Sequence, residues 1–516
     1  MTRWARTLFL ALAAFSIPAV VGAQSGRNVD WAMYNGTYSS ERYSSLAQIN
    51  RQNVGSLHAV CAFQLGQLGA MQTGPVVHNG TMFVTTQTTT FAIDARTCRQ
   101  KWKSTYKSVG PEQGIANRGV ALLGGKLFRG TPDAHLIALD EKTGTTLWDT
   151  KVADSSDGSS IIAAPIAWRD KVYAGLAGSE LGVKGKMFAL DVNDGHIVWT
   201  FDLIPTGSQA GADSWGRADS AVTGGGGTWT SYTLDPADGS LFIPVGNPGP
   251  DFSADYRPGA NLFTCSIVVL DANTGQLKWY FQEVPHDFHD WDTAAAPALF
   301  TALNGKSMIA FAGKDGYLVT LDRTSHKVVS KVAITTISNV SAPLTTEGTH
   351  FCPGTLGGVE WNGPAYSRLE KLTYVNAVDK CTTLKLGEAR YVRGQAFLGS
   401  GNGFGVGDAD ARGWLTAVNP ITGKIAWRYH ADSPMTAAVT PTAGGVVLTG
   451  SMSGWFLAFD SATGKVLYRF NTGGSVAGGV ATYMIDGKQY VAVDSGNVAR
   501  TPFPTSGAPI VFVFAL

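Results

Sequence analysis

Charge is what this chain has little of. Only 15% of its 516 residues are Asp, Glu, Lys or Arg, and its 40 basic residues nearly balance its 39 acidic ones. A near-neutral chain lacks the basic excess that marks proteins bound to nucleic acid or to an anionic membrane surface. We therefore expect no nucleic acid partner.

Several motifs for common cofactors and catalytic groups are also missing. There is no Cys-x-x-Cys-His, which excludes a covalently attached haem of the c type. No Gly-x-Gly-x-x-Gly phosphate loop follows a strand, and there is no Gly-x-Ser-x-Gly nucleophile elbow. His286 and His289 are three residues apart, but no third ligand supports them, so zinc stays a weak alternative.

Charged and apolar residues at the N-terminus follow the order of a secretory signal. Arg3 and Arg6 precede an apolar run from Leu8, and Val21-Gly22-Ala23 ends it. The run is too short for a membrane span, so we predict a signal peptide over residues 1–23, a mature domain over 24–516 and a periplasmic location. No cysteine lies near the predicted cleavage point, so we expect no lipid anchor.

One phrase recurs along the chain: a short apolar strand, an acid, a Thr-Gly or similar turn, and an aromatic residue. Most copies are 40 to 57 residues apart, which is typical of four-stranded propeller blades. A degenerate copy from Tyr374 completes a set of eight, so we predict an all-β fold, an eight-bladed β-propeller of four-stranded antiparallel blades. The acid or amide of each copy is Asp94, Asp140, Asp191, Asp271, Asp322, Asp379, Asn419 or Asp460.

The aromatic residue that ends the phrase is a tryptophan in five copies. A side chain at a fixed repeat position packs between neighbouring blades, so we interpret these five residues as structural. They are Trp102, Trp148, Trp199, Trp279 and Trp427.

Five cysteines remain in a chain predicted to be exported. Cys61 with Cys98, and Cys352 with Cys381, are the preferred disulfides because each pair closes a loop within one repeat. Cys265 is left over next to an apolar run, and we expect it to be a buried thiol.

The stretch Pro285–Asp292 stands outside the repeat. It places three carboxylates, two imidazoles and an indole in eight residues. Adjacent acids raise one another's pKa unless a cation or a hydrogen-bond network holds them. The stretch indicates half of a metal site or an acid/base centre, with a solvated surface loop as the alternative.

Several stretches outside the repeat occur in the order seen in one family. They are ERYSSLAQINRQNVGSL, NRGVALLGGKLFRGTPDAHLIALD, AGSELGVKGKMFALD, GGGGTWTSYTLDPADGSLFIPVGNPGP and PHDFHDWD. From about Trp31 to the last blade, the chain resembles the quinoprotein alcohol dehydrogenases that use pyrroloquinoline quinone (PQQ). The resemblance implies a PQQ cofactor and oxidation of an alcohol.

The resemblance also implies a metal site. Glu180, Asn247 and Asp290 match the family's calcium ligands, and two carboxylates with an amide oxygen suit a hard cation. Asp290 matches the catalytic base, and Asp292 matches an extra carboxylate of members that use lanthanide ions. The alternatives are an ion pair of Glu180 with Lys184 and a turn-capping role for Asn247.

Contacts to the quinone are implied by the same resemblance. Arg118 matches an arginine that pairs with quinone oxygens, Trp229 the tryptophan beneath the ring, and Lys314 a cationic contact at its reacting side. Core packing of Trp229 and a simple turn at Lys314 are the alternatives, and Trp414 competes with Trp455 for the role of an aromatic over the site. The full set of implied cofactor contacts is Gln72, Arg118, Gly178, Ser179, Trp229, Lys314 and Trp455.

Two departures from the family pattern concern the cofactor. Glu112-Gln113 replaces the family's adjacent cysteine pair, and Ile162 and Ala177 stand where hydroxyl side chains help to bind the quinone carboxylates. These losses bear on cofactor affinity more than on the chemistry.

The leading hypothesis is a periplasmic alcohol dehydrogenase that passes electrons to a separate acceptor such as cytochrome c. A non-catalytic propeller scaffold is the alternative from another class. The segment Phe351–Ser367 also resembles members related to polyvinyl alcohol dehydrogenase, so a sugar or polymeric alcohol stays open as substrate. We expect loops 104–116, 204–226 and 340–364 to set substrate size.

Overall fold

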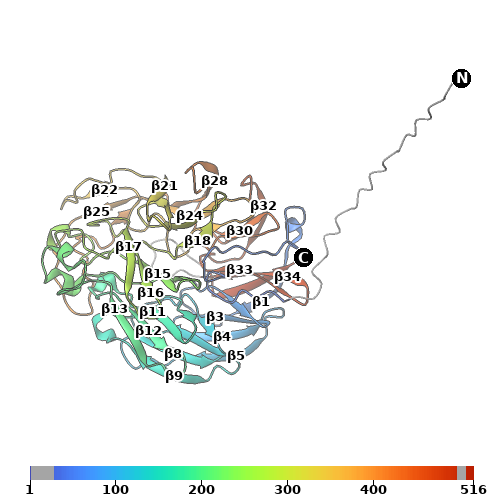
Figure 1. The fold of residues 1–516 in the computed structure, drawn as a ribbon, viewed down its shortest axis with the longest axis horizontal. Coiled ribbons are helices and arrows are strands. Elements are labelled where there is room, and N and C mark those ends of the chain that lie inside the picture. Colours follow the sequence, from blue (N-terminus) through green and yellow to red (C-terminus); the bar gives the residue numbers. More distant parts are fainter. Residues whose placement is uncertain (2–27, 497–506) are drawn as a thin grey trace.

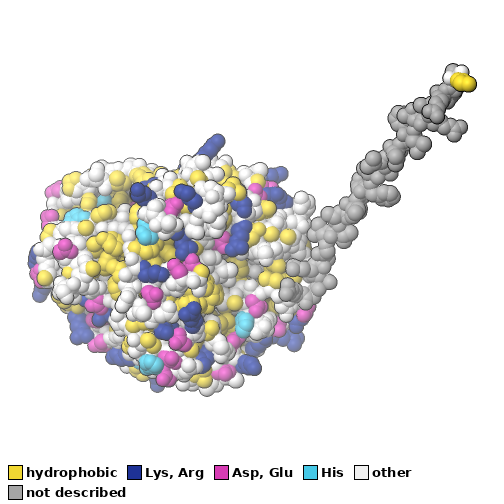
Figure 2. Space-filling view, viewed as in Figure 1, with side chains coloured by type: hydrophobic (Ala, Val, Ile, Leu, Met, Phe, Trp, Pro, Cys, Tyr) yellow, Lys and Arg dark blue, Asp and Glu magenta, His cyan; other side chains and the backbone are white. Residues whose placement is uncertain are grey.

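The computed structural model describes residues 1, 28–496 and 507–516 (Figure 1). Apart from Met1, the predicted signal peptide lies outside the described residues. Eight four-stranded antiparallel sheets stand side by side in a ring, which confirms the predicted eight-bladed propeller. On the face shown in Figure 2, basic and acidic side chains are interspersed, as the near-neutral composition predicts.

The first four blades follow one another along the chain. Blade one is β2 (Val76–His78), β3 (Thr81–Thr85), β4 (Thr89–Asp94) and β5 (Gln100–Thr105); blade two is β6 (Ala121–Leu123), β7 (Lys126–Gly130), β8 (His135–Asp140) and β9 (Thr146–Lys151). Blade three is β10 (Ile166–Trp168), β11 (Lys171–Gly175), β12 (Lys186–Asp191) and β13 (Ile197–Asp202); blade four is β14 (Thr233–Asp235), β15 (Ser240–Val245), β16 (Ser266–Asp271) and β17 (Leu277–Gln282).

The remaining blades include one insertion and the ring closure. Blade five is β18 (Ala298–Thr301), β19 (Ser307–Ala312), β20 (Tyr317–Asp322) and β21 (Val328–Ala333); blade six is β23 (Ala365–Tyr366), β24 (Thr373–Asp379), β27 (Arg412–Val418) and β28 (Ile425–Ala431). Blade seven is β29 (Thr440–Pro441), β30 (Val446–Gly450), β31 (Trp455–Asp460) and β32 (Val466–Asn471); blade eight is β33 (Val480–Ile485), β34 (Lys488–Ser495), β35 (Ile510–Ala515) and β1 (His58–Gln64). Short 3₁₀ turns are η1 (Val54–Ser56), η2 (Ser155–Asp157), η3 (Ser179–Leu181), η4 (Ala212–Trp215), η5 (Ser220–Thr223) and η6 (Ala254–Tyr256).

The eighth blade is built from both ends of the domain. Strand β1 pairs antiparallel with β35, from His58 opposite Ala515 to Gln64 opposite Ile510. The degenerate repeat from Tyr374 is therefore wrong as a separate blade, because Tyr374 lies in β24, opposite Ala417 of β27 in blade six. The predicted number of eight blades is still correct, because the closing blade is the eighth although it carries no copy of the phrase.

The recurring phrase forms the turn between the two outer strands of a blade. A tryptophan from the preceding blade packs against this turn. Asp140 accepts backbone N–H bonds within its turn, and Gly144 adopts a φ of +74°. A Cβ on Gly144 would lie 2.5 Å from the Trp102 ring, and Trp102 Nε1 donates to the Glu141 carbonyl at 3.1 Å. In blade five His326 takes the glycine position and stacks on Trp279 at 4.1 Å. These contacts agree with the structural role predicted for the tryptophans.

Apolar side chains fill the spaces between blades. Strand β15, buried along its whole length, packs Leu241 and Ile243 against Met187 and Ala189 of blade three. Burial of both faces of each sheet explains why the inner strands are apolar runs rather than alternating patterns.

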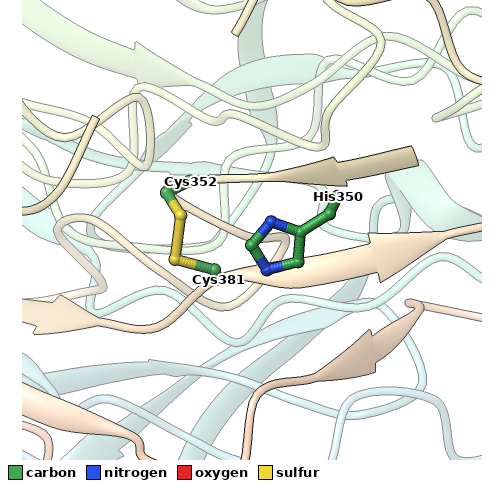
Figure 3. A group of neighbouring side chains, drawn as sticks. All are labelled: His350, Cys352 and Cys381. Carbon is green, nitrogen blue, oxygen red and sulfur yellow. A yellow bond between two sulfur atoms is a disulfide. The ribbon is translucent and has the colours of Figure 1, made fainter. Parts of the chain in front are cut away.

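An insertion between β24 and β27 of blade six pairs with a strand that precedes the blade and forms a separate three-stranded sheet. Its strands are β22 (Thr349–Phe351), β25 (Thr382–Leu384) and β26 (Val406–Gly407). The predicted Cys352–Cys381 disulfide ties β22 to the start of this insertion (Figure 3). His350 lies beside it, but the two sulfurs are bonded to each other and so are not metal ligands.

The other cysteines also agree with prediction. Cys61 of β1 is bonded to Cys98, and Cys265 is a buried free thiol. Among the described residues, none of the helical segments is long and apolar enough to pass through a membrane.

Candidate active site

A cavity of about 740 Å³ brings together most of the residues singled out from the sequence. Its wall includes loops between successive blades from blade one to blade six, loops within blades three and five, and part of the blade-six insertion. The predicted residues that line it are Gly178, Ser179, Glu180, Trp229, Asp290, Asp292 and Lys314.

Lys314 is paired with two carboxylates beside this cavity. Its Nζ lies 2.7 Å from Asp290 Oδ2 and 3.3 Å from Asp292 Oδ2, and all three side chains are buried. Burial alone would lower the pKa of Lys314, but Asp290 and Asp292 raise it well above its usual range. Lys314 is thus a buried cation, not a solvent-facing turn residue.

Asp290 occupies a strained backbone position with a φ of +64°. Burial, and then the nearby carboxylates Asp292, Asp251 and Glu180, raise its pKa well above the usual range, while Lys314 opposes them. Its Oδ1 is buried without a hydrogen-bond partner among the described residues. One oxygen is therefore fixed by Lys314, and the other is free to accept a proton or bind a cation.

Asn247 presents a second unpartnered oxygen. Its backbone N–H donates to Asp292 Oδ1 at 2.8 Å, and its side-chain Oδ1 is buried without a partner in the described part of the chain.

Glu180 is not paired with Lys184. Lys184 pairs with Asp202 at 2.7 Å, which removes that alternative. Burial raises the pKa of Glu180, and the Asp292 charge adds to this.

This donor set fits a hard cation. Three carboxylates and an amide oxygen are the ligands that calcium and lanthanide ions take, and two of the buried oxygens have no other partner within the described residues. The oxygens of Glu180, Asp290 and Asp292 do not close to within 4.8 Å of one another. Mutual repulsion of the three carboxylates favours this spacing, whereas the Lys314 ammonium attracts Asp290 and Asp292.

Arg118 lies in the wall behind Trp229. It donates to the Trp229 carbonyl and, at 2.8 Å, to Gln72 Oε1, and its guanidinium lies 4.9 Å from the Trp229 ring centre. Arg118 is buried and is not part of a surface ion pair, and burial lowers its pKa to about 10. Neither Arg118 nor Gln72 is among the residues that line the cavity.

Gly178 and Ser179 connect the Glu180 segment to the glycine-rich segment before Trp229. Gly178 has a φ of +123°, and a Cβ there would lie 2.8 Å from the Gly158 carbonyl. Ser179 Oγ accepts the Gly227 N–H at 2.8 Å. Both residues fix the cavity wall through backbone geometry.

Trp455 is a further predicted residue that does not line this cavity. It starts β31 and packs against the cluster that contains Trp427 and Phe459, with the Arg469 guanidinium 5.4 Å from its ring centre. Trp414, the alternative, donates to Asp379 Oδ2 at 2.7 Å and likewise does not line the cavity.

His286 and His289 do not share a metal. His286 Nδ1 contacts the Gly259 carbonyl at 2.6 Å, whereas His289 stacks on Trp291 with ring centres 4.0 Å apart. Burial lowers the pKa of His289 to about 3, so the ring is neutral and its 3.9 Å approach to Asp287 is no ion pair. The zinc alternative finds no support.

Three polar residues at or near the site were missed from the sequence. Glu360 and Ser160 line the cavity, and Asp251 is buried close to its carboxylates. Burial raises the pKa of Glu360 to about 7, against the opposing effect of Lys314. An acid four residues after Asn247 was a visible signal for Asp251, whereas nothing in the sequence distinguished Glu360 or Ser160.

Only part of the expected substrate loops reaches the cavity. Gly114 and Ile115 come from loop 104–116, and Thr355, Leu356 and Glu360 from loop 340–364, but no residue of 204–226 lines the wall. The missed contribution is the blade-six insertion, which supplies Lys380, Thr382, Ala396, Leu398, Phe404, Gly405 and Gly407. Repeat spacing assigned the Tyr374 copy to a blade of its own and could not show where the residues between β24 and β27 fold.

Comparison with known proteins bears directly on this site. Residues 31–343 match the family model described as glucose/ethanol/alcohol dehydrogenase, beta-propeller domain. The quinoprotein alcohol dehydrogenase PedH of Pseudomonas putida is 32% identical, over 93% of this chain and 88% of the relative. The chain belongs to the quinoprotein alcohol dehydrogenase family.

Two further relatives of this family carry a metal in their names. The lanthanide-dependent methanol dehydrogenase of Methylacidiphilum fumariolicum is 31% identical, over 90% of this chain and 84% of the relative. A solved europium-containing methanol dehydrogenase superposes with a TM-score of 0.85 at 28% identity, over 95% of this chain and 98% of that chain. The quinoprotein alcohol dehydrogenase fold thus extends over 95% of this chain.

The C-terminal part also matches a second model. Residues 411–504 match the one described as outer membrane protein assembly factor BamB. A solved BamB from Moraxella catarrhalis superposes with a TM-score of 0.51 at 16% identity, so this likeness concerns the propeller fold alone.

The chain is an enzyme of the quinoprotein alcohol dehydrogenase family and oxidises an alcohol.

Proposed function

We propose that this cavity binds PQQ together with a calcium or lanthanide ion and oxidises an alcohol that enters beneath the blade-six insertion. The observation that carries the proposal is the geometry at Asp290. One of its oxygens is held 2.7 Å from Lys314, and the other is buried and unpartnered among the described residues. Burial of an unpaired carboxylate oxygen costs free energy, and a propeller that serves only as a scaffold gains nothing from it.

The metal would be held by Glu180, Asn247, Asp290 and Asp292. Asp292 also accepts the backbone N–H of Asn247, so two of these donors are fixed relative to each other. When bound, PQQ supplies the hydride acceptor, and the ion acts as a Lewis acid toward it. The protein contributes position, charge and a base.

Asp290 takes the proton of the alcohol hydroxyl as the hydride leaves the carbinol carbon. Burial and the neighbouring acids raise its pKa in the metal-free protein, and a bound cation would lower the pKa and keep the carboxylate ionised before the reaction. Lys314 holds the second oxygen and so orients the carboxylate. Trp229 provides a flat wall for the quinone ring, and Arg118 fixes Trp229 from behind.

The substrate side of the cavity is mainly apolar. Ile115, Leu356, Leu398 and Phe404 line it together with the charged residues. This lining favours a small alcohol with an apolar chain over a sugar, because a sugar would bury hydroxyl groups against carbon. The insertion that supplies Leu398 and Phe404 also narrows access for a polymer.

Electrons leave the site to a separate acceptor, and a cytochrome c in the periplasm is our proposal. The sequence has no haem attachment motif of its own, and the N-terminal signal predicted over residues 1–23 would export the chain.

Reconstitution tests the proposed function. Metal-free protein is titrated with PQQ and with calcium or a lanthanide, while quinone absorbance and dye-linked oxidation of an alcohol panel are followed. We expect turnover only when quinone and metal are both present, and a loss of about 10²- to 10⁴-fold in Asp290→Asn with the quinone still bound. Absence of quinone binding with either ion would refute the proposal and favour a scaffold.

A further inference from the structure

Asp251 is a buried carboxylate to which the described residues give no hydrogen bond. The side chain is fully buried, and both of its oxygens lack a partner in the described part of the chain. An ionised carboxylate in such a place is costly unless a cation compensates it. The position therefore calls for a cation that the polypeptide does not provide by hydrogen bonding.

The backbone around Asp251 is clamped. Arg257 Nη2 donates to the Asp251 carbonyl at 2.9 Å and Arg257 Nε to the Pro250 carbonyl at 3.0 Å. The remaining bond of the guanidinium, from Nη1, goes to Asn261 Oδ1 at 3.0 Å, and Phe252 N donates to the Leu398 carbonyl at 2.9 Å. Arg257 thus fixes the loop but makes no hydrogen bond to the carboxylate.

Asp251 belongs electrostatically to the carboxylates of the metal site. It lies four residues after Asn247 on the same loop and is not among the residues that line the cavity. Burial, and then the charges of Glu180 and Asp292, raise its pKa well above the usual range, and Asp251 in turn raises the pKa of Asp290. It therefore adds charge to the site from the protein interior rather than from the substrate side.

The formal charges around this point decide which ion suits it. Six carboxylates and three cations interact here, which leaves three negative charges. The carboxylates are Glu180, Asp251, Asp287, Asp290, Asp292 and Glu360, and the cations are Lys314, Arg257 and Arg118. A divalent ion leaves one of them uncompensated, whereas a trivalent ion balances them all. The charge of the quinone is the same in both cases and cancels from the comparison.

We propose that Asp251 is a fourth carboxylate of the metal site and makes this chain prefer a trivalent lanthanide ion over calcium. This inference rests on the proposed function for the existence of the metal site, but not for its redox chemistry. Asp251 acts on ion choice through its charge and need not contact substrate.

The test measures ion binding directly. Full-length purified protein is titrated with Tb³⁺, with and without PQQ, by luminescence sensitised through tryptophan, and the bound Tb³⁺ is then displaced with Ca²⁺. We expect Asp251→Asn to weaken Tb³⁺ binding more than Ca²⁺ binding, so that the ratio of the two dissociation constants changes by about tenfold or more toward Ca²⁺. Asp251→Glu, which keeps the charge, is expected to retain most of the wild-type preference.

Asp494 provides a matched control. It is also fully buried with both oxygens unpartnered among the described residues, and its pKa is raised by burial with no contribution from the carboxylates of the site. Asp494→Asn is expected to keep the wild-type ion preference. In metal-free protein we expect Asp251→Asn to raise the melting temperature, because it relieves repulsion among the carboxylates.

Two results would overturn the inference: the same Tb³⁺/Ca²⁺ ratio in Asp251→Asn as in wild type, or no Tb³⁺ binding by wild type. If Asp251→Asn does not fold, equal weakening of Tb³⁺ and Ca²⁺ binding in Asp251→Glu would refute it instead. Failure of the proposed function gives a different pattern, in which Tb³⁺ preference depends on Asp251 but PQQ does not bind.

Discussion

Lys314 Nζ donates to Asp290 Oδ2 at 2.7 Å inside a buried cluster of carboxylates. The two residues lie 24 positions apart, on the loops that lead out of blade four and across blade five. Without a metal ion, Lys314 is the nearest compensating cation for Asp290 and Asp292. The same ammonium reduces the repulsion between those two carboxylates.

Lys314→Gln should therefore destabilise the metal-free protein. Removal of one partner of a buried ion pair leaves uncompensated charge and costs about 3–5 kcal/mol in the free energy of unfolding. Saturating calcium or lanthanide should recover most of this loss, because the ion replaces the missing positive charge. Thermal unfolding with a chelator and with added metal measures both effects.

The control for this variant is Lys306→Gln. Lys306 pairs with Asp322 at 3.4 Å, but its side chain is 62% exposed, and such surface pairs contribute about 0–1 kcal/mol. A Lys314→Gln protein whose loss of stability is the same with and without metal would contradict the assigned role.

Glu360 should make the stability of the metal-free protein depend on pH. Its pKa is raised by burial to about 7 from a usual value of 4.5. A raised carboxyl pKa gives stability that is fully present below pH 4.5 and is lost as the pH rises through about 7. Glu360→Gln should remove this dependence and be more stable than wild type above pH 7.

Denaturant unfolding of metal-free protein between pH 5 and 8.5 measures this effect. Each pKa unit corresponds to about 1.4 kcal/mol, so the expected difference at the alkaline end is roughly 2–3 kcal/mol. Parallel stability curves for Glu360→Gln and wild type would mean that Glu360 is ionised at neutral pH in the folded protein, which would contradict the prediction.

The fold was predictable because its signal is repeated. The Asp-Thr-Gly turns and their docked tryptophans recur at blade spacing, so errors in one copy do not alter the architecture. The copy predicted from Tyr374 was the exception, because its residues belong to a strand of blade six. The eighth blade is instead formed where β1 pairs with β35. Pairing between the chain ends leaves no local mark in the sequence.

The site was predictable only where a motif had unusual chemistry. Asp290 and Asp292 were found because a dense cluster of acids outside the repeat is costly, whereas Glu180 and Lys314 were found by resemblance. Glu360 escaped prediction because a single acid in a loop is ordinary until its burial is known. The blade-six insertion escaped because its place over the cavity depends on tertiary packing and a disulfide.

The Cys352–Cys381 disulfide should affect both stability and substrate binding. It closes 29 residues of sequence and adjoins Lys380 and Thr382, which line the cavity. The double variant to Ser should lose roughly 2–4 kcal/mol of stability. It should also raise KM more than it lowers kcat, because the insertion forms part of the substrate wall.

The second disulfide is the matched control. Cys61–Cys98 spans 37 residues, and neither cysteine is among the residues that line the cavity. Its removal should cost a similar free energy of unfolding but leave KM unchanged. Steady-state kinetics of both double variants, together with unfolding curves, separate the two roles, and equal effects on KM would contradict a specific role for the insertion.

Ala177→Ser should tighten PQQ binding. Ala177 lines the cavity next to Gly178, its backbone N–H donates to the Ser160 carbonyl at 2.9 Å, and its methyl group offers no hydrogen-bond donor. A hydrogen bond to a charged group is worth about 1.5–3 kcal/mol, so we expect the dissociation constant of PQQ to fall by roughly tenfold. Ala396→Ser adds the same hydroxyl to the insertion side of the cavity and should leave that constant unchanged. Quinone absorbance titrations of the two variants decide the matter: equal affinities would mean that the quinone carboxylates do not face Ala177, and a gain confined to Ala177→Ser would place them there.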